Sequence, residues 1–297
     1  MNPAAERAKY VFAVILYGTI GLFLRYVSIP SEIVAMCRGL IGGSFILVYL
    51  KARGQRLDRE AIRRNLKWLV IAGVSLGLNW IFLFAAYMHT TVAIASLCNY
   101  MAPIIVILIA PLVLRERLDR RKMPAVAAAF VGIILVSGVW KGAAGSVSGV
   151  LMGLAAALCF VVIVICNRKF RDIPSLDRSV LQLLISAVTI FPYALVRSWG
   201  NPPPVDARTV LIVLMLGLLH TGVAYCFYFK GIGSLPVQTV AVLGYLEPVV
   251  SVLCSALFLR EPLGAAGWIG AVLIIGAAVA CELLGSGPSE AGSPEPG

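Results

Sequence analysis

The sequence predicts an all-α membrane protein with ten transmembrane helices arranged as two inverted five-helix repeats. Hydrophobic residues make up 60% of the 297 positions and charged residues only 13%. The charges gather in short clusters between apolar runs of about 20 residues, a length that crosses about 30 Å of hydrocarbon as a helix. Two further observations, an uneven distribution of basic residues and an internal repeat, complete the prediction.

The apolar runs define the expected elements. The first run follows a short basic start and has no small-residue cleavage site, so we interpret it as a membrane helix rather than a removed signal peptide. Residues 286–297 form a polar tail that we expect to be disordered. The expected spans are 10–27, 31–50, 66–87, 91–113, 122–140, 146–166, 178–197, 207–230, 234–259 and 264–284.

Lysine and arginine indicate how the chain is oriented. With the N-terminus inside, the cytoplasmic segments hold 19 of the 25 basic residues, the outside loops hold five, and Arg38 lies within a span. Because cytoplasmic loops carry the basic excess, both termini are predicted to be cytoplasmic, in a multi-pass protein of the cell inner membrane. We interpret the net charge of +11 as a topology signal and an attraction to membrane lipid, not to nucleic acid.

The repeat appears when the chain is shifted by 145 residues. Val92–Leu118 then aligns with Val237–Leu263, and nine of the 27 positions are identical. Because each copy holds five spans, an odd number, the second copy must enter the membrane from the opposite side. We therefore divide the chain into repeats at 1–144 and 145–285, followed by the tail at 286–297. The matched pairs include Tyr100/Tyr245, Pro103/Pro248, Arg115/Arg260 and Glu116/Glu261.

These residues resemble those of a known family. The ten spans in two inverted halves, the Arg in "MCRGL", and "YMAP…LRERL" with "YLEPVV…LREPL" are similar to the EamA-type drug/metabolite transporters. The resemblance covers residues 10–284. It implies small-molecule transport without a specified substrate, and the family includes YddG-type exporters of amino acids.

Two charged residues within spans are candidate binding groups. A cation inside a span is costly, so Arg38 is expected to face a polar cavity, where it either anchors a substrate carboxylate or pairs structurally with backbone carbonyls or Glu247. Glu247 either binds a proton or an amine, or accepts hydrogen bonds from backbone freed by Pro248. Gln182 aligns with Arg38 under a shift of 144, which suggests that the seventh span also lines the pathway.

Polar and aromatic residues in the middle of spans complete the predicted binding site. Aromatic walls with a few amides suit a moderately apolar zwitterion whose ammonium contacts a ring face, although packing could explain any one of them. Pro103 and Pro248 are predicted hinges, because proline removes a helical hydrogen bond and bends the helix. The candidate lining residues are Asn79, Trp80, Asn99, Tyr100, His220, Tyr225, Tyr228 and Tyr245.

Other classes of protein lack their signatures. The seven cysteines lie in apolar segments without CxxC spacing, so neither a metal site nor a cofactor is expected. HExxH and Walker A sequences are absent, which argues against a metalloprotease and direct use of ATP.

The resulting hypothesis is a non-enzymatic secondary transporter that exports small metabolites, above all aromatic or other apolar amino acids, by alternating access. The alternatives are a proton-coupled exchanger of another organic solute or drug, and a membrane receptor or scaffold without transport. Spans five and ten carry little polarity, so they are expected at the periphery or in a homodimer contact.

Overall fold

The structure, a computed structural model, describes residues 3–113, 120–137, 144–198, 205–235, 243–261 and 263–285. Helices make up most of these ranges, which contain no β-strand. The tail at 286–297 and the Arg115–Glu116 pair lie outside the described residues. The helices are α1 (Pro3–Leu24), α2 (Ser31–Ala52), α3 (Arg59–His89), α4 (Val92–Asn99), α5 (Ala102–Val113), α6 (Met123–Ser137), α7 (Ala144–Asn167), α8 (Ser175–Ser198), α9 (Ala207–Gly217), α10 (Ala224–Ser234), α12 (Leu246–Leu257) and α13 (Gly264–Gly285), with a short 3₁₀ turn η1 (Arg120–Lys122) and a π-helical segment η3 (Leu218–Val223).

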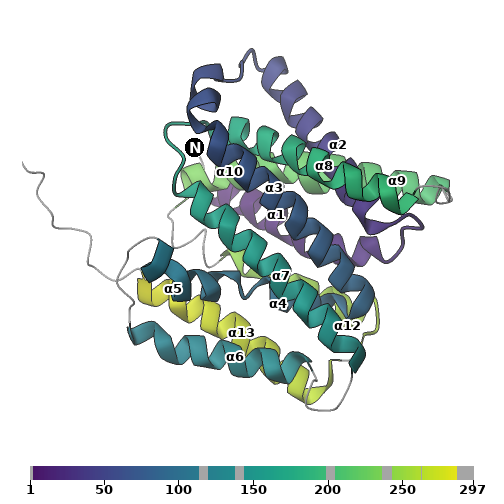
Figure 1. The fold of residues 1–297 in the computed structure, drawn as a ribbon, viewed down its shortest axis with the longest axis vertical. Helices are drawn as coiled ribbons and strands as arrows, with labels where there is room; N and C mark the ends of the chain where they lie inside the picture. Colours follow the sequence, from purple (N-terminus) through teal and green to yellow (C-terminus); the bar gives the residue numbers. More distant parts are fainter. Residues whose placement is uncertain are drawn as a thin grey trace, which may run out of the picture.

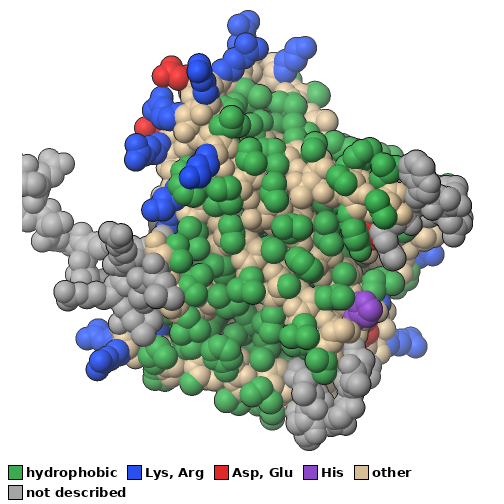
Figure 2. Space-filling view, viewed as in Figure 1, with side chains coloured by type: hydrophobic (Ala, Val, Ile, Leu, Met, Phe, Trp, Pro, Cys, Tyr) green, Lys and Arg blue, Asp and Glu red, His purple; other side chains and the backbone are tan. Residues whose placement is uncertain are grey.

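The surface of the bundle is that of a membrane protein. Eight of the described helical segments are long and apolar enough to cross a membrane, and the shorter Leu246–Leu257 is also apolar. Large apolar side chains point outward, among them Val188, Leu211 and Val272, each 69% exposed. Figure 2 shows hydrophobic side chains across the middle of one face, with Lys and Arg side chains mostly near its edges. The predicted α-helical, multi-pass membrane protein is therefore confirmed.

The helices pack in a definite order around the middle of the bundle (Figure 1). Helix α3 packs along α7 and α8, α1 packs along α10 and α12, and α6 packs along α13 at one side. Glycines allow these close approaches: a Cβ atom on Gly39 of α2 would lie 2.9 Å from the carbonyl oxygen of Leu183 in α8. A Cβ atom on Gly132 of α6 would lie 2.8 Å from the carbonyl oxygen of Gly270 in α13. Small residues thus set the distances between the helices.

Two spans are interrupted at corresponding tyrosines. Helices α4 and α5 separate after Tyr100, which has φ −73° and ψ 0°, and Tyr245 precedes α12 with φ −72° and ψ −4°. Pro103 and Pro248 each follow three residues later, in the first turns of α5 and α12. Because proline has no N–H to donate to the carbonyl four residues earlier, each helix loses a bond at this place. The predicted hinge prolines therefore stand at helix starts, not within continuous helices.

Connecting segments meet at the two ends of the bundle. At one end, the backbone N–H of Asp58 donates to the carboxylate of Asp177 at 2.8 Å. At the other, Arg25 forms an ion pair with Glu261 at 2.7 Å. Lysine and arginine are concentrated at the end that holds Asp58 and Asp177, which we call the basic end (residues 51–67, 168–178 and 230). We call the end that holds Arg25 and Glu261 the opposite end (residues 25–30, 89–92, 205–209 and 258–261).

Candidate functional site

A cavity of about 320 Å³ lies among the helices. Its walls come from α1, α2, α3, α4, α7, α8, α10 and α12, whereas the described residues of α5, α6 and α13 contribute nothing. The apolar walls therefore carry a small number of charged and amide groups, the usual composition of a ligand site. The lining residues are Tyr17, Ile20, Arg38, Leu76, Asn79, Trp80, Leu83, Phe84, Tyr87, Asn99, Phe160, Ile163, Asn167, Arg178, Gln182, Tyr225, Tyr228 and Glu247.

Arg38 brings a positive charge to this cavity from α2, and only 3% of the residue is exposed. Its Nε donates to the hydroxyl of Thr221 at 3.3 Å. Its guanidinium carbon lies 4.7 Å from the ring centroid of Trp80 and 5.7 Å from that of Phe84. Within the described part of the chain, no carboxylate forms an ion pair with Arg38. The guanidinium is therefore positioned to accept the anionic group of a ligand.

Two asparagines fix the wall next to Arg38. The Nδ2 of Asn79 donates to Oδ1 of Asn99 at 3.0 Å and to the carbonyl of Ala156 at 2.8 Å. These bonds join α3, α4 and α7 around one side chain. Because buried amides are costly without partners, this arrangement holds the three helices in register. Asn79 thus orients the wall, and Asn99 presents its amide to the cavity.

Three tyrosines form a second wall. The ring centroid of Tyr17 lies 5.9 Å from that of Tyr225 and 5.7 Å from that of Tyr228, with the planes steeply inclined. Tyr228 in turn stacks on Tyr10 at 5.2 Å. Edge-to-face packing of this kind makes a rigid aromatic surface between α1 and α10.

A second cluster of polar groups lines the same cavity. Glu247 is the second residue of α12, and it lines the cavity. Arg178 and Gln182 come from successive turns of α8. Among the described residues, the cavity lining therefore carries two guanidinium groups and one carboxylate, and this excess of positive charge favours a ligand with a negative group.

Eight of the eleven predicted binding residues line the cavity. They are Arg38, Asn79, Trp80, Asn99, Gln182, Tyr225, Tyr228 and Glu247.

The other three predicted residues do not line it. His220 lies in the π-helical segment η3 and faces α1, where its Nε2 lies 3.0 Å from Oγ1 of Thr19. Tyr245 donates to the carbonyl of Ala278 in α13 at 3.1 Å. Tyr100 follows Asn99, which lines the cavity, but is not itself a lining residue.

Several lining residues were missed by the sequence analysis. Tyr17 and Tyr87 lie in strongly apolar spans, and a single tyrosine in a span is not distinctive. Asn167 and Arg178 flank the basic connector between α7 and α8. Arg178 was counted among the basic residues that indicate topology, and Asn167 was not singled out. The alignment of Gln182 with Arg38 was the available signal, since it points to this part of α8.

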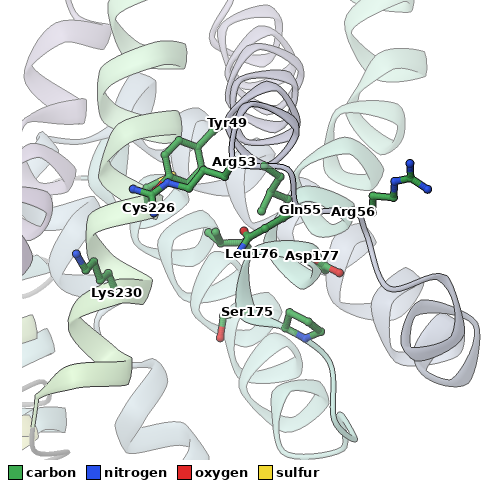
Figure 3. Close-up of a pocket in the computed structure, with 11 residues that line it drawn as sticks. Tyr49, Arg53, Gln55, Arg56, Ser175, Leu176, Asp177, Cys226 and Lys230 are labelled. Atoms are coloured by element: carbon green, nitrogen blue, oxygen red, sulfur yellow. The ribbon is translucent and has the colours of Figure 1, made fainter.

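A second hollow of about 540 Å³ lies at the basic end between α2, α8 and α10 (Figure 3). Arg53 stacks over Tyr49 with its guanidinium carbon 5.3 Å from the ring centroid. Figure 3 shows Arg56 pointing away from the other labelled residues. The hollow shares no lining residue with the first cavity. It is therefore a separate surface feature at the level of the connectors.

An all-helical membrane bundle around a cavity lined by charged, amide and aromatic groups has the architecture of a membrane transporter. The model of the EamA-like transporter family matches the chain twice, over residues 10–138 and 147–281. The chain belongs to the EamA-like transporter family.

Individual relatives agree with this assignment. The uncharacterized transporter YxxF of Bacillus subtilis is 24% identical over 84% of this chain and 80% of its own length. A probable amino-acid metabolite efflux pump of Salmonella typhimurium is 28% identical over 55% of this chain and 58% of its own. A crystal structure of another protein has a TM-score of 0.66, covers 94% of this chain and 98% of its own, and is 23% identical, so it supports the fold alone. The first two relatives are named as a transporter and as an efflux pump.

Proposed function

We propose that the protein is a secondary transporter that exports small metabolites, above all aromatic or other apolar amino acids, by alternating access. The observation that carries the proposal is Arg38, a buried guanidinium without a carboxylate partner in the described residues, held on the faces of Trp80 and Phe84 inside a cavity. This geometry suits a carboxylate on Arg38 with the apolar part of the solute on the aromatic walls. The efflux relative, named for amino-acid metabolites, points to the same chemistry.

We further propose ten spans in two inverted repeats, residues 1–144 and 145–285. The two matches of the family model support this division. The helix contacts support it as well: α3 packs on α7 as α1 packs on α10, and α4 packs on α7 as α1 packs on α12. Exchanging the two halves maps each of these contacts onto its counterpart, as an approximate two-fold axis would require. On this division α4 with α5 forms one span, and α9, η3 and α10 form another.

The basic end is proposed to face the cytoplasm of a cell whose inner membrane holds the protein. Its concentration of lysine and arginine supports that orientation, with both termini inside. The cavity is lined toward this end by Asn167, which is exposed, and by Arg178. At the opposite end, the Glu261–Arg25 ion pair joins the connectors. We interpret this conformation as open to the cytoplasm and closed to the outside.

Reconstitution of the purified protein into proteoliposomes tests the proposed function. Efflux of labelled amino acids down their gradient is expected from protein-containing vesicles and not from empty ones. A thermal-shift screen against metabolites identifies the ligand first, because a solute bound only by the folded state raises its apparent stability. A stabilising ligand without any flux would instead favour a receptor.

Glu247 supports the second candidate, a proton-coupled exchanger, because it is the one carboxylate that lines the cavity in the described residues. An exchanger would respond to an imposed pH gradient, and Glu247→Gln would abolish that response. Flux that ignores the pH gradient in the wild type would leave the facilitator as the better description. Retention of the pH response in Glu247→Gln would exclude this carboxylate as the coupling site.

A further inference from the structure

The hydroxyl group of Tyr17 is unusual among the groups that line the cavity. It is buried, and it has no hydrogen-bond partner among the described residues. The hydroxyl of the neighbouring Tyr87 differs, because it lies 3.3 Å from Oγ of Ser96. Buried polar groups in proteins are nearly always paired, so an unpaired one on a residue that lines a cavity indicates a group that a ligand completes.

The position of Tyr17 is tightly fixed. Its ring is held edge-on by Tyr225 and Tyr228. The next residue, Gly18, lies directly against α12: a Cβ atom there would be 2.6 Å from the carbonyl oxygen of Glu247 and 2.7 Å from Cβ of Val250. Helix α1 therefore meets α12 at the residue whose carboxylate lines the cavity. This contact fixes the backbone beside Tyr17.

The cavity thus has two chemically different sides. Arg38 supplies a cation on the wall made by Trp80 and Phe84. Tyr17 and Glu247 supply oxygen atoms from the contact between α1 and α12. Oxygen atoms from a phenol and a carboxylate are acceptors for an ammonium group, whereas a guanidinium binds a carboxylate. A zwitterion would satisfy both sides at once.

We propose that Tyr17 is a substrate-binding residue which, with Glu247, receives the ammonium group of an amino acid whose carboxylate lies on Arg38. This inference rests on the proposed transport function and adds the residue that distinguishes amino acids from acids without an amine. A site built to bond a polar substrate group discriminates strongly against analogues that lack it, because its own buried groups are then left unpaired.

Equilibrium binding to the purified full-length protein tests the inference separately from transport. The apolar and aromatic L-amino acids are titrated first, and the tightest ligand is then compared with its deaminated acid, such as phenylalanine with 3-phenylpropionate. Tyr17→Phe removes one oxygen atom and keeps the ring. Its Kd for the amino acid is expected to rise about tenfold, which corresponds to about 1.4 kcal/mol, while its Kd for the deaminated acid stays within about twofold of the wild type.

Tyr193→Phe is the matched control, since this tyrosine of α8 is 42% exposed and lies outside the cavity. It is expected to bind both ligands as the wild type does. An unchanged Kd for the amino acid in Tyr17→Phe, an equal loss for both ligands, or a wild type that binds no amino acid would each overturn the inference. If the wild type binds the amino acid but shows no flux in proteoliposomes, the proposed transport function would be contradicted, whereas the assignment of Tyr17 would stand.

Discussion

Glu261 and Arg25 form an ion pair at 2.7 Å although 236 positions separate them in the chain. The other carboxylate oxygen of Glu261 accepts a hydrogen bond from the backbone N–H of Val92 at 2.9 Å and one from the hydroxyl of Ser255 at 2.6 Å. Arg25 also donates to the carbonyl of Thr90 at 3.0 Å. One carboxylate thus connects the end of α12 to the start of α4 and to the connector after α1. This network holds the opposite end of the bundle together.

Glu261→Gln is expected to loosen that end. The amide cannot form the ion pair, and charge-assisted hydrogen bonds are the stronger kind. The reporter is Ser96→Cys in a cysteine-free background, because Ser96 is buried behind the network. We expect an impermeant thiol reagent added outside cells to label it about tenfold faster, equivalent to about 1.4 kcal/mol. Glu60→Gln, in an exposed pair with Arg64, is the control. Equal labelling rates in all three backgrounds would contradict the role of Glu261.

Arg38→Ala is expected to abolish transport without destabilising the protein. Its guanidinium has no ion-pair partner among the described residues, so its removal leaves no orphaned carboxylate and relieves the cost of a cation within a span. We expect the KM for a carboxylate substrate to rise about 100-fold or more, as loss of a bidentate charged contact implies. The KM of Arg38→Lys should fall between those of the wild type and Arg38→Ala, because an ammonium group cannot form two parallel hydrogen bonds to a carboxylate. Unchanged flux in Arg38→Ala, measured in proteoliposomes, would show that Arg38 does not anchor the substrate carboxylate.

The paired breaks at Pro103 and Pro248 are expected to matter for rate more than for affinity. Alanine at either position restores the N–H donor and favours a continuous helix, so the two halves would exchange conformations more slowly. We expect kcat for transport to fall about tenfold in the double variant with Kd unchanged. Pro192→Ala is the control, because α8 continues through this proline. A double variant with wild-type kcat would show that the breaks are static.

The crossing of α6 and α13 should tolerate substitution at one glycine and not at another. A Cβ atom on Gly270 would lie 2.5 Å from the carbonyl oxygen of Gly132, whereas one on Gly276 would have nothing within 4 Å. Gly270→Val should therefore lower the Tm of the purified protein by several degrees, and Gly276→Val should change it little. Light scattering of Gly276→Val also tests the proposed homodimer through spans five and ten. An equal loss of Tm in both variants would show that the crossing does not set stability.

The spans were predictable because each apolar run is bounded by charges. The expected segment 31–50, for example, corresponds to α2 at Ser31–Ala52. The break at Tyr100 was not predicted as such, since proline was expected to bend a continuous helix. A proline leaves a carbonyl unpaired but does not determine whether the chain bends or separates; the packing around it decides.

The candidate site was predictable where a residue was chemically out of place. Arg38 and Glu247 are charges inside apolar runs, and both line the cavity. Tyr17 could not be found this way, because a tyrosine suits both a cavity wall and a packed interior. His220 differs from these two charges: its Nε2 lies next to Thr19, so a polar residue in the middle of a span can also find its partner within the protein.

The π-helical segment η3 sets the direction of the side chains that follow it in the span. We therefore expect that removing one of its residues would change which solutes the cavity admits. The hydroxyl of Thr221 donates to the carbonyl of Leu216, five residues earlier, at 2.9 Å. Deleting one residue from 218–223 would turn every following side chain of that span by about 100°. Tyr225 and Tyr228 would then face other helices, and the span would still be long enough to cross the bilayer. Such a shortened variant would keep its place in the membrane while admitting different solutes.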